Sequence, residues 1–185
     1  MSSKNYAKYK MLIIKNKIDS ILNNKKLSHY ELCKRIDFHQ GSFSMILNRK
    51  RVFSKNLIEK LIPILEVSKE EFESWVLAEK YPKELLKLAI EVRKAFPYKR
   101  KPILQNKLDA ALQQAEMSRT NLSKLINYNQ SGLNRMITGK INMSKSVLEK
   151  TANILDIPQN QLQSWIIADN YKLPLLEKAY QCYEN

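Results

Sequence analysis

An internal repeat is the feature that most limits how this chain of 185 residues can fold. When residues 13–90 are laid on residues 103–180 without a gap, 24 of the 78 aligned positions are identical. Many of the other pairs keep their size and polarity, as in Phe38 with Tyr128 or Val76 with Ile166. A constant offset over most of a chain is typical of a duplicated structural unit. The sequence therefore predicts two copies of one fold.

Both copies have the hydrophobic pattern of helices rather than strands. Ile18, Ile21 and Leu22 fall at helical spacing, and so do Leu108 and Leu112 of the second copy. No stretch alternates apolar and polar residues with the period of two that marks a strand. Serine is favoured just before the first turn of a helix, and it recurs at such points as Ser28, Ser54, Ser118 and Ser144. The predicted fold class is therefore all-α.

The centre of each copy is a serine-capped short helix, a three-residue turn and a second short helix. After Ser28 these segments read HYELCKRI, DFH and QGSFSMILN, and after Ser118 they read RTNLSKLI, NYN and QSGLNRMIT. This pattern resembles the helix-turn-helix of the lambda-repressor-like (Cro/XRE) family. That family has a leucine and a small residue in the first helix, an apolar residue in the turn, and glutamine or serine at the start of the second helix. The matching residues are Leu32, Cys33, Phe38, Gln40, Phe43, Ile46 and Lys50 in the first copy, and Leu122, Ser123, Tyr128, Gln130, Leu133, Met136, Gly139 and Lys140 in the second.

Two features depart from the family pattern. Arg49 stands where the family usually has glycine at the exit of the second helix, whereas the second copy keeps Gly139. Asp37 and Asn127 replace the usual glycine of the turn. Both residue types tolerate the left-handed conformation that ends a helix, so the family fold is still expected. The resemblance implies two tandem lambda-repressor-like helix-turn-helix domains that cover nearly the whole chain.

The resemblance also implies that the second short helix of each copy enters the major groove of duplex DNA, which is about 12 Å wide. Apolar residues such as Phe43 and Leu133 would anchor this helix and leave its other face for the bases. Glutamine and asparagine can pair with adenine and arginine with guanine, so the second copy has the stronger base-reading set. The predicted base-reading residues are Gln40, Gly41, Ser44 and Met45 in the first copy, and Gln130, Ser131, Asn134 and Arg135 in the second.

Polar and basic residues around these helices are the predicted contacts to DNA phosphates, which position a protein on the duplex. Residues 25–60 hold nine Lys and Arg against three Asp and Glu, whereas residues 66–91 hold four against seven. An ordinary solvated cluster is the alternative for Arg49, Lys50 and Arg51. The predicted phosphate contacts are Ser28, His29, Arg49, Lys50, Arg51 and Lys55 in the first copy, and Ser118, Arg119, Lys140 and Lys145 in the second.

A third group of residues is apolar and follows the motif at helical spacing. It comprises Phe72, Trp75 and Val76 in the first copy and Leu162, Trp165 and Ile166 in the second. These residues are predicted to pack, and they are also the candidate surface for pairing. Pairing would give either an intramolecular pseudo-dimer of the two copies or a homodimer of two chains. Cys33 is predicted to be a small buried filler, and Cys182 a residue of the tail.

The repeat also predicts the domain boundaries. The first domain is expected over 1–92, a basic linker over 93–102 and the second domain over 103–185. The segment EVRKAFPYKRKP, which spans 91–102, is basic and carries two prolines, as a connector would.

The net charge of +14 favours a polyanionic partner, either nucleic acid or an anionic membrane surface. No apolar run approaches the roughly 18–20 residues that span a bilayer, and the basic residues do not gather on one long amphipathic helix. Double-stranded DNA without a membrane, in the cytoplasm with the nucleoid, is therefore the expected setting. Two cysteines, two histidines and three glycines lack the spacing of zinc sites and phosphate-binding loops. No metal, cofactor or catalytic residue is predicted.

The predicted function is sequence-specific binding of duplex DNA by two heads per chain, as a transcriptional regulator and most simply as a repressor. Two alternatives from other classes stay open. One is a protein-interaction or antitoxin-like scaffold module, which would show a large apolar patch on the second short helices. The other is a DNA-architectural or recruitment factor with weak sequence preference. An enzyme is not expected.

Overall fold

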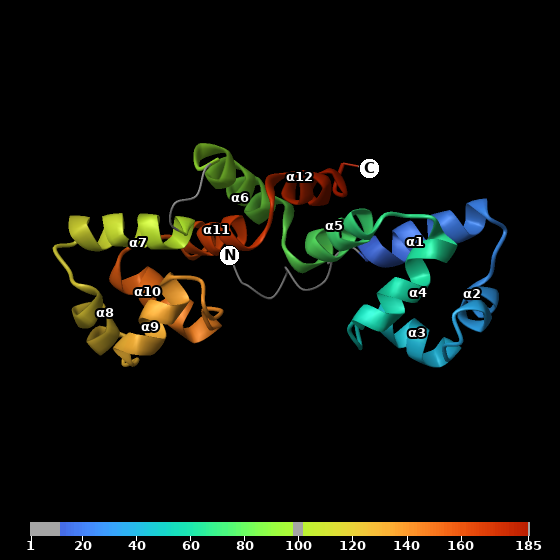
Figure 1. Cartoon of the computed structure of the whole chain (residues 1–185), viewed down its shortest axis with the longest axis horizontal. Coiled ribbons are helices and arrows are strands. Elements are labelled where there is room, and N and C mark those ends of the chain that lie inside the picture. The colour runs from blue at the N-terminus through green and yellow to red at the C-terminus, as the bar shows by residue number, and fades with distance from the viewer. Residues whose placement is uncertain (1–11, 98–101, 185) are drawn as a thin grey trace, which may run out of the picture. The chain divides into compact units, whose positions relative to one another are not determined.

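The computed structural model describes residues 12–97 and 102–184, and every regular element in these ranges is an α-helix (Figure 1). This confirms the all-α class predicted from the hydrophobic pattern. Contacts between Cα atoms divide the chain into two compact units. Unit 1 holds the described residues up to Pro82 together with those from Lys178 onward, and unit 2 spans Lys83–Glu177. Unit 1 is therefore built from two segments that lie far apart in the sequence.

The helices of each unit follow one another through short connections. Unit 1 contains α1 (Ile13–Asn24), α2 (His29–Arg35), α3 (Gln40–Leu47), α4 (Lys55–Leu65) and α5 (Lys69–Lys80). Unit 2 contains α6 (Lys83–Ala95), α7 (Ile103–Gln114), α8 (Arg119–Leu125), α9 (Gln130–Ile137), α10 (Lys145–Ile154) and α11 (Gln159–Asn170). The last helix, α12 (Leu173–Gln181), contributes its first residues to unit 2 and its last residues to unit 1.

Serine side chains begin the helices where the sequence places them. The Ser28 hydroxyl accepts a hydrogen bond from the Glu31 amide at 3.2 Å, while the Glu31 carboxylate accepts one from the Ser28 amide at 2.8 Å. This reciprocal pair is a capping box, and it satisfies two amides that the first turn of α2 leaves without helical partners. Ser118 caps α8 through the Asn121 amide at 3.1 Å. The predicted N-caps Ser54 and Ser144 accept in the same way at the starts of α4 and α10.

Left-handed backbone ends several helices, at positions that repeat along the chain. Seven non-glycine residues among those described have φ between 49° and 60°, and Gly139 has φ of 73°. Residues in this conformation close a helix and turn the chain, at a cost of roughly 1–2 kcal/mol for a residue with a side chain. They form four pairs that are each separated by 90 residues, namely Lys26 with Glu116, Asp37 with Asn127, Arg49 with Gly139, and Glu66 with Asp156.

The core of unit 1 gathers side chains from α1 to α5. Phe72 is fully buried, and its ring lies 5.5 Å from that of Phe53 and 5.4 Å from that of Trp75, measured between centroids. Trp75 is 3% exposed, while Val76 is partly buried. The predicted packing residues of this copy therefore face the interior. Their use as a surface shared with another copy or another chain stays a prediction.

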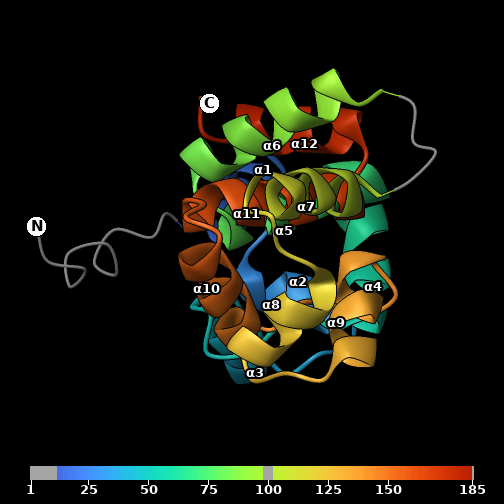
Figure 2. The same ribbon diagram turned by 90° about the vertical axis from the view of Figure 1, so that its left-hand side faces the viewer.

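The core of unit 2 gathers buried side chains from α7, α8, α9, α10 and α11. Leu162 and Trp165 lie within its buried cluster, and Ile166 packs against that cluster. The carboxylate of Asp169 on α11 accepts hydrogen bonds from the amides of Ile103 and Leu104, both at 2.8 Å, and so caps the start of α7. Figures 1 and 2 show α8 and α9 on one side of α7 and α11, with α6 on the other.

Helix α6 extends further than the repeat predicts. It ends at Ala95, so Arg93 and Lys94 of the expected basic linker are helical. Residues 98–101 of that linker lie outside the described residues. The division into a first domain over 1–92, a linker over 93–102 and a second domain over 103–185 stays a prediction.

Candidate nucleic-acid interface

Helices α8 and α9 of unit 2 form a helix-turn-helix with a buried contact between them. Leu122 of α8 and Leu133 of α9 are both fully buried, and Ser123 is 4% exposed. A side chain as small as that of Ser123 lets two helices approach closely, and its hydroxyl donates to the Thr120 carbonyl at 2.8 Å. The turn closes when the Tyr128 amide donates to the Ser123 carbonyl at 2.9 Å.

Two side chains fix the ends of this turn. The Asn129 carboxamide oxygen accepts from the Gly132 amide at 2.6 Å and so caps α9. The ammonium group of Lys150, from α10, donates to the Ile126 carbonyl at 3.1 Å, just after the last residue of α8. A positive charge at the C-terminal end of a helix is favourable because carbonyl groups there lack helical partners. Together these contacts hold α9 at a fixed angle to α8.

The outer face of α9 is polar, whereas its inner face is apolar. Leu133, Met136 and Ile137 are buried, and the remaining side chains point away from the core. Gln130, Ser131 and Arg135 are exposed and Asn134 is half-buried. These four predicted base-reading residues line one shallow hollow with Thr138 and Lys140. The polar face of such a helix can enter the major groove of DNA, which is about 12 Å wide, while its apolar face stays packed on the core.

A hydrogen-bonded chain organises one end of this face. The Arg119 guanidinium binds the Asp109 carboxylate of α7 through Nε at 2.8 Å and through Nη2 at 2.6 Å. A third nitrogen of Arg119 donates to the carboxamide oxygen of Asn134 at 3.3 Å. Arginine carries donors only, so the carboxamide of Asn134 must turn its oxygen toward Arg119. Its NH2 group is thereby left as the part of the amide that can meet a base.

Gln130 is oriented by a neighbour on the other helix. Its side-chain NH2 group donates to the Thr120 hydroxyl at 2.7 Å. One N–H of this group is thereby used, while the carboxamide oxygen and the second N–H remain available. That combination matches adenine, which offers an N6 donor and an N7 acceptor in the major groove. Gln130 and Asn134 therefore present different hydrogen-bonding groups, although both carry the same amide.

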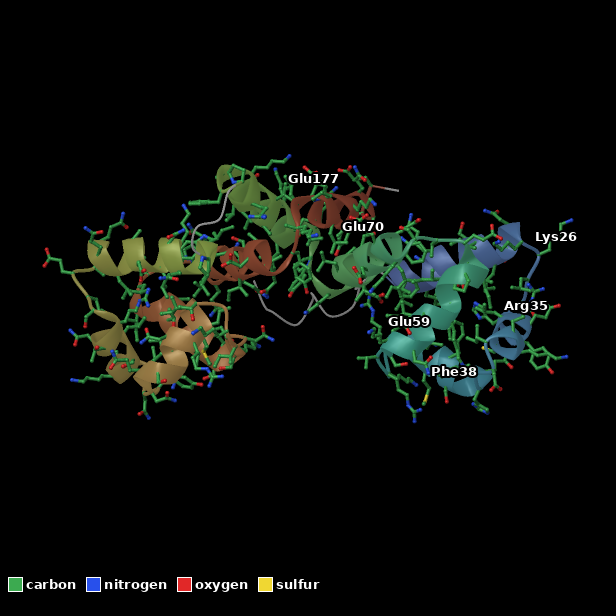
Figure 3. All side chains as sticks on the ribbon, in the orientation of Figure 1. Lys26, Arg35, Phe38, Glu59, Glu70 and Glu177 are labelled. Atoms are coloured by element: carbon green, nitrogen blue, oxygen red, sulfur yellow. The ribbon has the colours of Figure 1, made fainter. Side chains whose placement is uncertain are left out.

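Helices α2 and α3 of unit 1 have a similar buried frame. Leu32 and Phe43 are buried like Leu122 and Leu133, and Cys33 is 2% exposed at the place of Ser123. Burial raises the pKa of the Cys33 thiol, as befits a residue that fills space. The Lys60 ammonium donates to the Ile36 carbonyl at 2.9 Å, which is the same contact as in unit 2 at an offset of 90 residues. Phe38 lies half-buried in the turn between the two helices (Figure 3).

The outer face of α3 carries fewer polar groups than that of α9. Gln40, Gly41 and Ser44 are exposed and Met45 is half-buried. The Ser44 backbone carbonyl accepts a hydrogen bond from the Asn48 side chain at 2.9 Å. At the position of Arg119, His29 places its Nε2 atom 2.7 Å from the Asp19 carboxylate. The position of Asn134 is taken by Ser44, whose short side chain replaces an amide on this face.

The predicted phosphate contacts divide into exposed and engaged groups. Lys50, Arg51 and Lys140 are exposed, and Lys55 and Lys145 are exposed with a carboxylate four residues further along at 3.9 and 3.7 Å. Such surface pairs contribute little and leave the ammonium groups accessible. Arg49 is different, because its guanidinium pairs with Glu79 of α5, whose side chain is only 10% exposed. A phosphate contact by Arg49 would compete with that carboxylate. Ser28 and Ser118 cap helices, and His29 and Arg119 face Asp19 and Asp109.

Several residues that position these helices were not predicted from the sequence. Asp19 and Asp109 hold the first residue of α2 and α8, and Lys60 and Lys150 close the ends of these helices. These four residues form two identical pairs in the repeat, so identity between the copies was the available signal. Thr120 gives no such signal, because the first copy has Tyr30 at its place.

Two kinds of site are absent from the part of the chain that the structure describes. No group of three or more His, Cys, Asp or Glu side chains is placed to hold a metal ion there. None of the helices in residues 12–97 and 102–184 is long and apolar enough to cross a bilayer.

Comparison with known families agrees with this geometry. Residues 107–166 match the family model of the Cro/C1-type HTH DNA-binding domain. The matched residues lie in unit 2, include α8 and α9 completely, and make up less than half of the chain. The match supports membership of this segment in the helix-turn-helix family and a DNA-binding role for it. Comparisons with curated proteins and with solved structures find no match.

Proposed function

We propose that this protein is a sequence-specific transcriptional regulator that reads the major groove of duplex DNA with two helix-turn-helix heads in one chain. The head of unit 2 reads bases with α9, and the head of unit 1 uses α3. The observation that carries the proposal is the outer face of α9, where Gln130, Asn134 and Arg135 line one hollow beside a firmly anchored helix. Repression is the expected mode, because a bound chain covers its site without needing a further partner.

The two heads have different tasks in this proposal. Arg135 pairs with guanine and Gln130 with adenine, while Asn134 donates to an acceptor on a base. The exposed ammonium groups of Lys140 and Lys145 neutralise phosphates beside them. The first head has Gly41 and Met45 in place of two polar readers, and it binds chiefly through charge. Because both heads share one chain, binding of one head makes binding of the other intramolecular and so raises its effective concentration near the duplex.

The case for a second head in unit 1 rests on local geometry. The buried frame, the lysine that closes the first helix and the left-handed ends of the helices recur there at an offset of 90 residues. Residues 25–60 also carry nine Lys and Arg against three Asp and Glu, which suits a phosphate backbone. The protein-interaction alternative requires an apolar patch on α3 or α9. Among the described residues the large exposed apolar side chains are Tyr30, Val52 and Leu125, all outside those two helices.

Selection of bound duplexes from a random pool, with the full chain, tests the proposal. The expected result is a defined motif whose strongest positions include guanine and adenine. Repeating the selection with Gln130→Ala and with Gln40→Ala should remove one preferred base pair in the first case and change the motif little in the second. Recovery of no motif, with binding that depends only on salt, would favour the architectural factor. Absence of any binding at low salt would favour the interaction module.

A further inference from the structure

The two compact units do not coincide with the two halves of the repeat. At the offset of 90 residues, α6 (Lys83–Ala95) corresponds to residues 173–185, which include α12. Helix α6 belongs to the first half of the sequence but lies in unit 2, whose other helices come from the second half. Residues 178–184 belong to the second half but lie in unit 1. The first half thus gives all of α6 to the unit built by the second half, and the second half gives the last residues of α12 and those after it to the unit built by the first.

In unit 2, α6 is part of the core rather than an attachment. Leu85, Leu86 and Ala89 are buried, and α6 makes its most extensive packing with α11. Beyond them, Val92 and Phe96 pack against the buried cluster of the unit. The Lys107 ammonium lies 5.1 Å above the centroid of the Phe96 ring. Removal of α6 would therefore expose apolar surface of α11 to water.

In unit 1, Lys178, Cys182 and Tyr183 each make a polar contact to α5. The Tyr183 hydroxyl lies 2.5 Å from the Ala78 carbonyl and 2.6 Å from the Tyr81 carbonyl, at the end of α5 where carbonyls lack helical partners. The Cys182 thiol is buried and lies 3.8 Å from the hydroxyl of Ser74, which is 1% exposed. Near the start of α5, the carboxylate of Glu70 (Figure 3) pairs with the Lys178 ammonium at 2.9 Å.

The side chains favour this exchange over closure of each half on itself. The residue of α6 that corresponds to Lys178 is Leu88, so α6 on its own α5 would set an aliphatic side chain beside Glu70. The Lys178 ion pair with Glu70 is available only to the end of α12. Within unit 2, Lys94 of α6 pairs with Glu177, in the first part of α12, at 2.9 Å.

We infer that the two halves of this chain exchange their sixth helices, so that the docking face of α5 takes the end of α12 and the docking face of α11 takes α6. Each half is then an incomplete domain whose partner is the other half of the same chain. It follows that neither 13–97 nor 102–184 folds to its full stability alone. The peptide link between the halves is not needed to hold them together.

Cleavage of the full chain tests the inference directly. A site-specific protease sequence inserted between Pro97 and Pro102 allows the folded protein to be cut once. The two pieces should elute together in size-exclusion chromatography at the volume of the uncut protein, and separate only in denaturant. Pieces that separate under native conditions would overturn the exchange.

Cross-linking distinguishes the exchanged arrangement from its alternative. In a Cys33→Ala background, Ser74→Cys should form a disulfide with Cys182 and so join the two pieces after cleavage on a non-reducing gel. Ser164→Cys is the matched control, since Ser164 corresponds to Ser74 and should not react with Cys182. If each half closed on itself, the control would react within one piece and Ser74→Cys would not. Burial raises the pKa of the Cys182 thiol, so oxidation is carried out at alkaline pH, and a short bis-maleimide gives the same readout.

Two further results complete the test. Val92→Cys with Ser164→Cys, which are the equivalents of Cys182 and Ser74, should also join the two pieces because α6 packs on α11. The uncut Ser74→Cys protein should run as a monomer after oxidation. A covalent dimer would show that the exchange takes place between two chains, and it would contradict the statement that one chain completes itself. None of these readouts depends on DNA binding.

Discussion

The helix pair α8–α9 and the helix pair α2–α3 share a buried frame and differ on the face that points away from it. Leu122 and Leu32 are buried alike, and Lys150 and Lys60 make the same contact to a backbone carbonyl. On the outer face, Asn134 and Arg135 correspond to Ser44 and Met45. The frame is constrained by packing, because a change of even one methylene is felt in a close-packed core. The outer face has no such constraint, so its residues report what each helix binds.

The largest expected effect tests the shared frame. Phe43→Ala should lower the free energy of unfolding by about 3–5 kcal/mol and Leu133→Ala by about 2–5 kcal/mol, since both side chains are at most 1% exposed and leave a cavity. Urea denaturation followed by tryptophan fluorescence measures both, because Trp75 lies in unit 1 and Trp165 in unit 2. A loss below about 1 kcal/mol in either variant would mean that its helix is not anchored by that residue.

The next effect tests the difference between the outer faces. Arg135→Ala should reduce discrimination at one base pair by about 1–3 kcal/mol, because a bidentate contact to guanine is lost. Met45→Ala changes the corresponding residue of α3 and should alter discrimination much less. Binding to the selected duplex and to single-base variants, measured at one salt concentration, separates the two. Equal weakening of every sequence by Arg135→Ala would contradict its role as a base reader.

A smaller effect on specificity is expected from the chain of contacts behind Asn134. Asp109→Asn removes the charge that holds Arg119, so the carboxamide of Asn134 is released to rotate. Preference at the base pair next to Asn134 should fall by about 0.5–1.5 kcal/mol, the net value of one hydrogen bond. Asp19→Asn is the matched change in unit 1, where Ser44 carries no amide, and it should leave specificity unchanged. The measurement is the ratio of affinities for single-base variants, which a loss of stability alone would not move.

Much of this arrangement could be predicted from the sequence, and the exceptions have physical causes. The repeat, the serine caps and the apolar spacing predict the helices because each depends on neighbouring residues. The pairing of Arg49 with Glu79 could not be predicted, since these residues are 30 positions apart and meet only through the packing of α5. Arg49 takes the left-handed backbone that Gly139 adopts in unit 2, with φ of 60° against 73°. Unit 1 thus has an arginine where unit 2 has glycine, and the side chain of Arg49 is held by its partly buried ion pair with Glu79.

The placement of α6 is the second feature that local patterns do not reach. Its apolar residues show that it packs, and Leu85 and Leu86 are identical with Leu175 and Leu176 of the second half. Identity between two copies makes their docking faces alike, so the hydrophobic pattern cannot distinguish α5 from α11 as the partner. The distinction lies in positions where the copies differ, such as Lys178 and Tyr183, whose places in the first copy are taken by Leu88 and Arg93. The contacts that these residues make are visible only when the three-dimensional arrangement is known.

Phosphate contacts should give a uniform effect without loss of specificity. Lys140→Ala should weaken binding to all sequences alike and reduce the slope of log affinity against log salt by about one unit, because one fewer counterion is released. Lys50→Ala is the equivalent change in the first head and should reduce the slope by a similar amount if both heads engage. Titrations at four or more salt concentrations measure the two slopes. An unchanged slope for Lys50→Ala alone would restrict DNA binding to unit 2.

The smallest effect concerns the two helix starts, α2 and α8. Hydrogen bonds from Ser28 hold the pKa of the Glu31 carboxyl below its ordinary value of 4.5, whereas α8 has Asn121 at this place. A group whose pKa is lowered by folding adds stability above its unfolded pKa, and that stability is lost as the pH falls through the folded value. Glu31→Gln should therefore lower the melting temperature near neutral pH and have no effect well below pH 4.5, the ordinary value of this carboxyl. Asn121→Gln, the control, should show no such dependence on pH. A Glu31→Gln difference that stays constant across this pH range would mean that the charge of Glu31 does not stabilise α2.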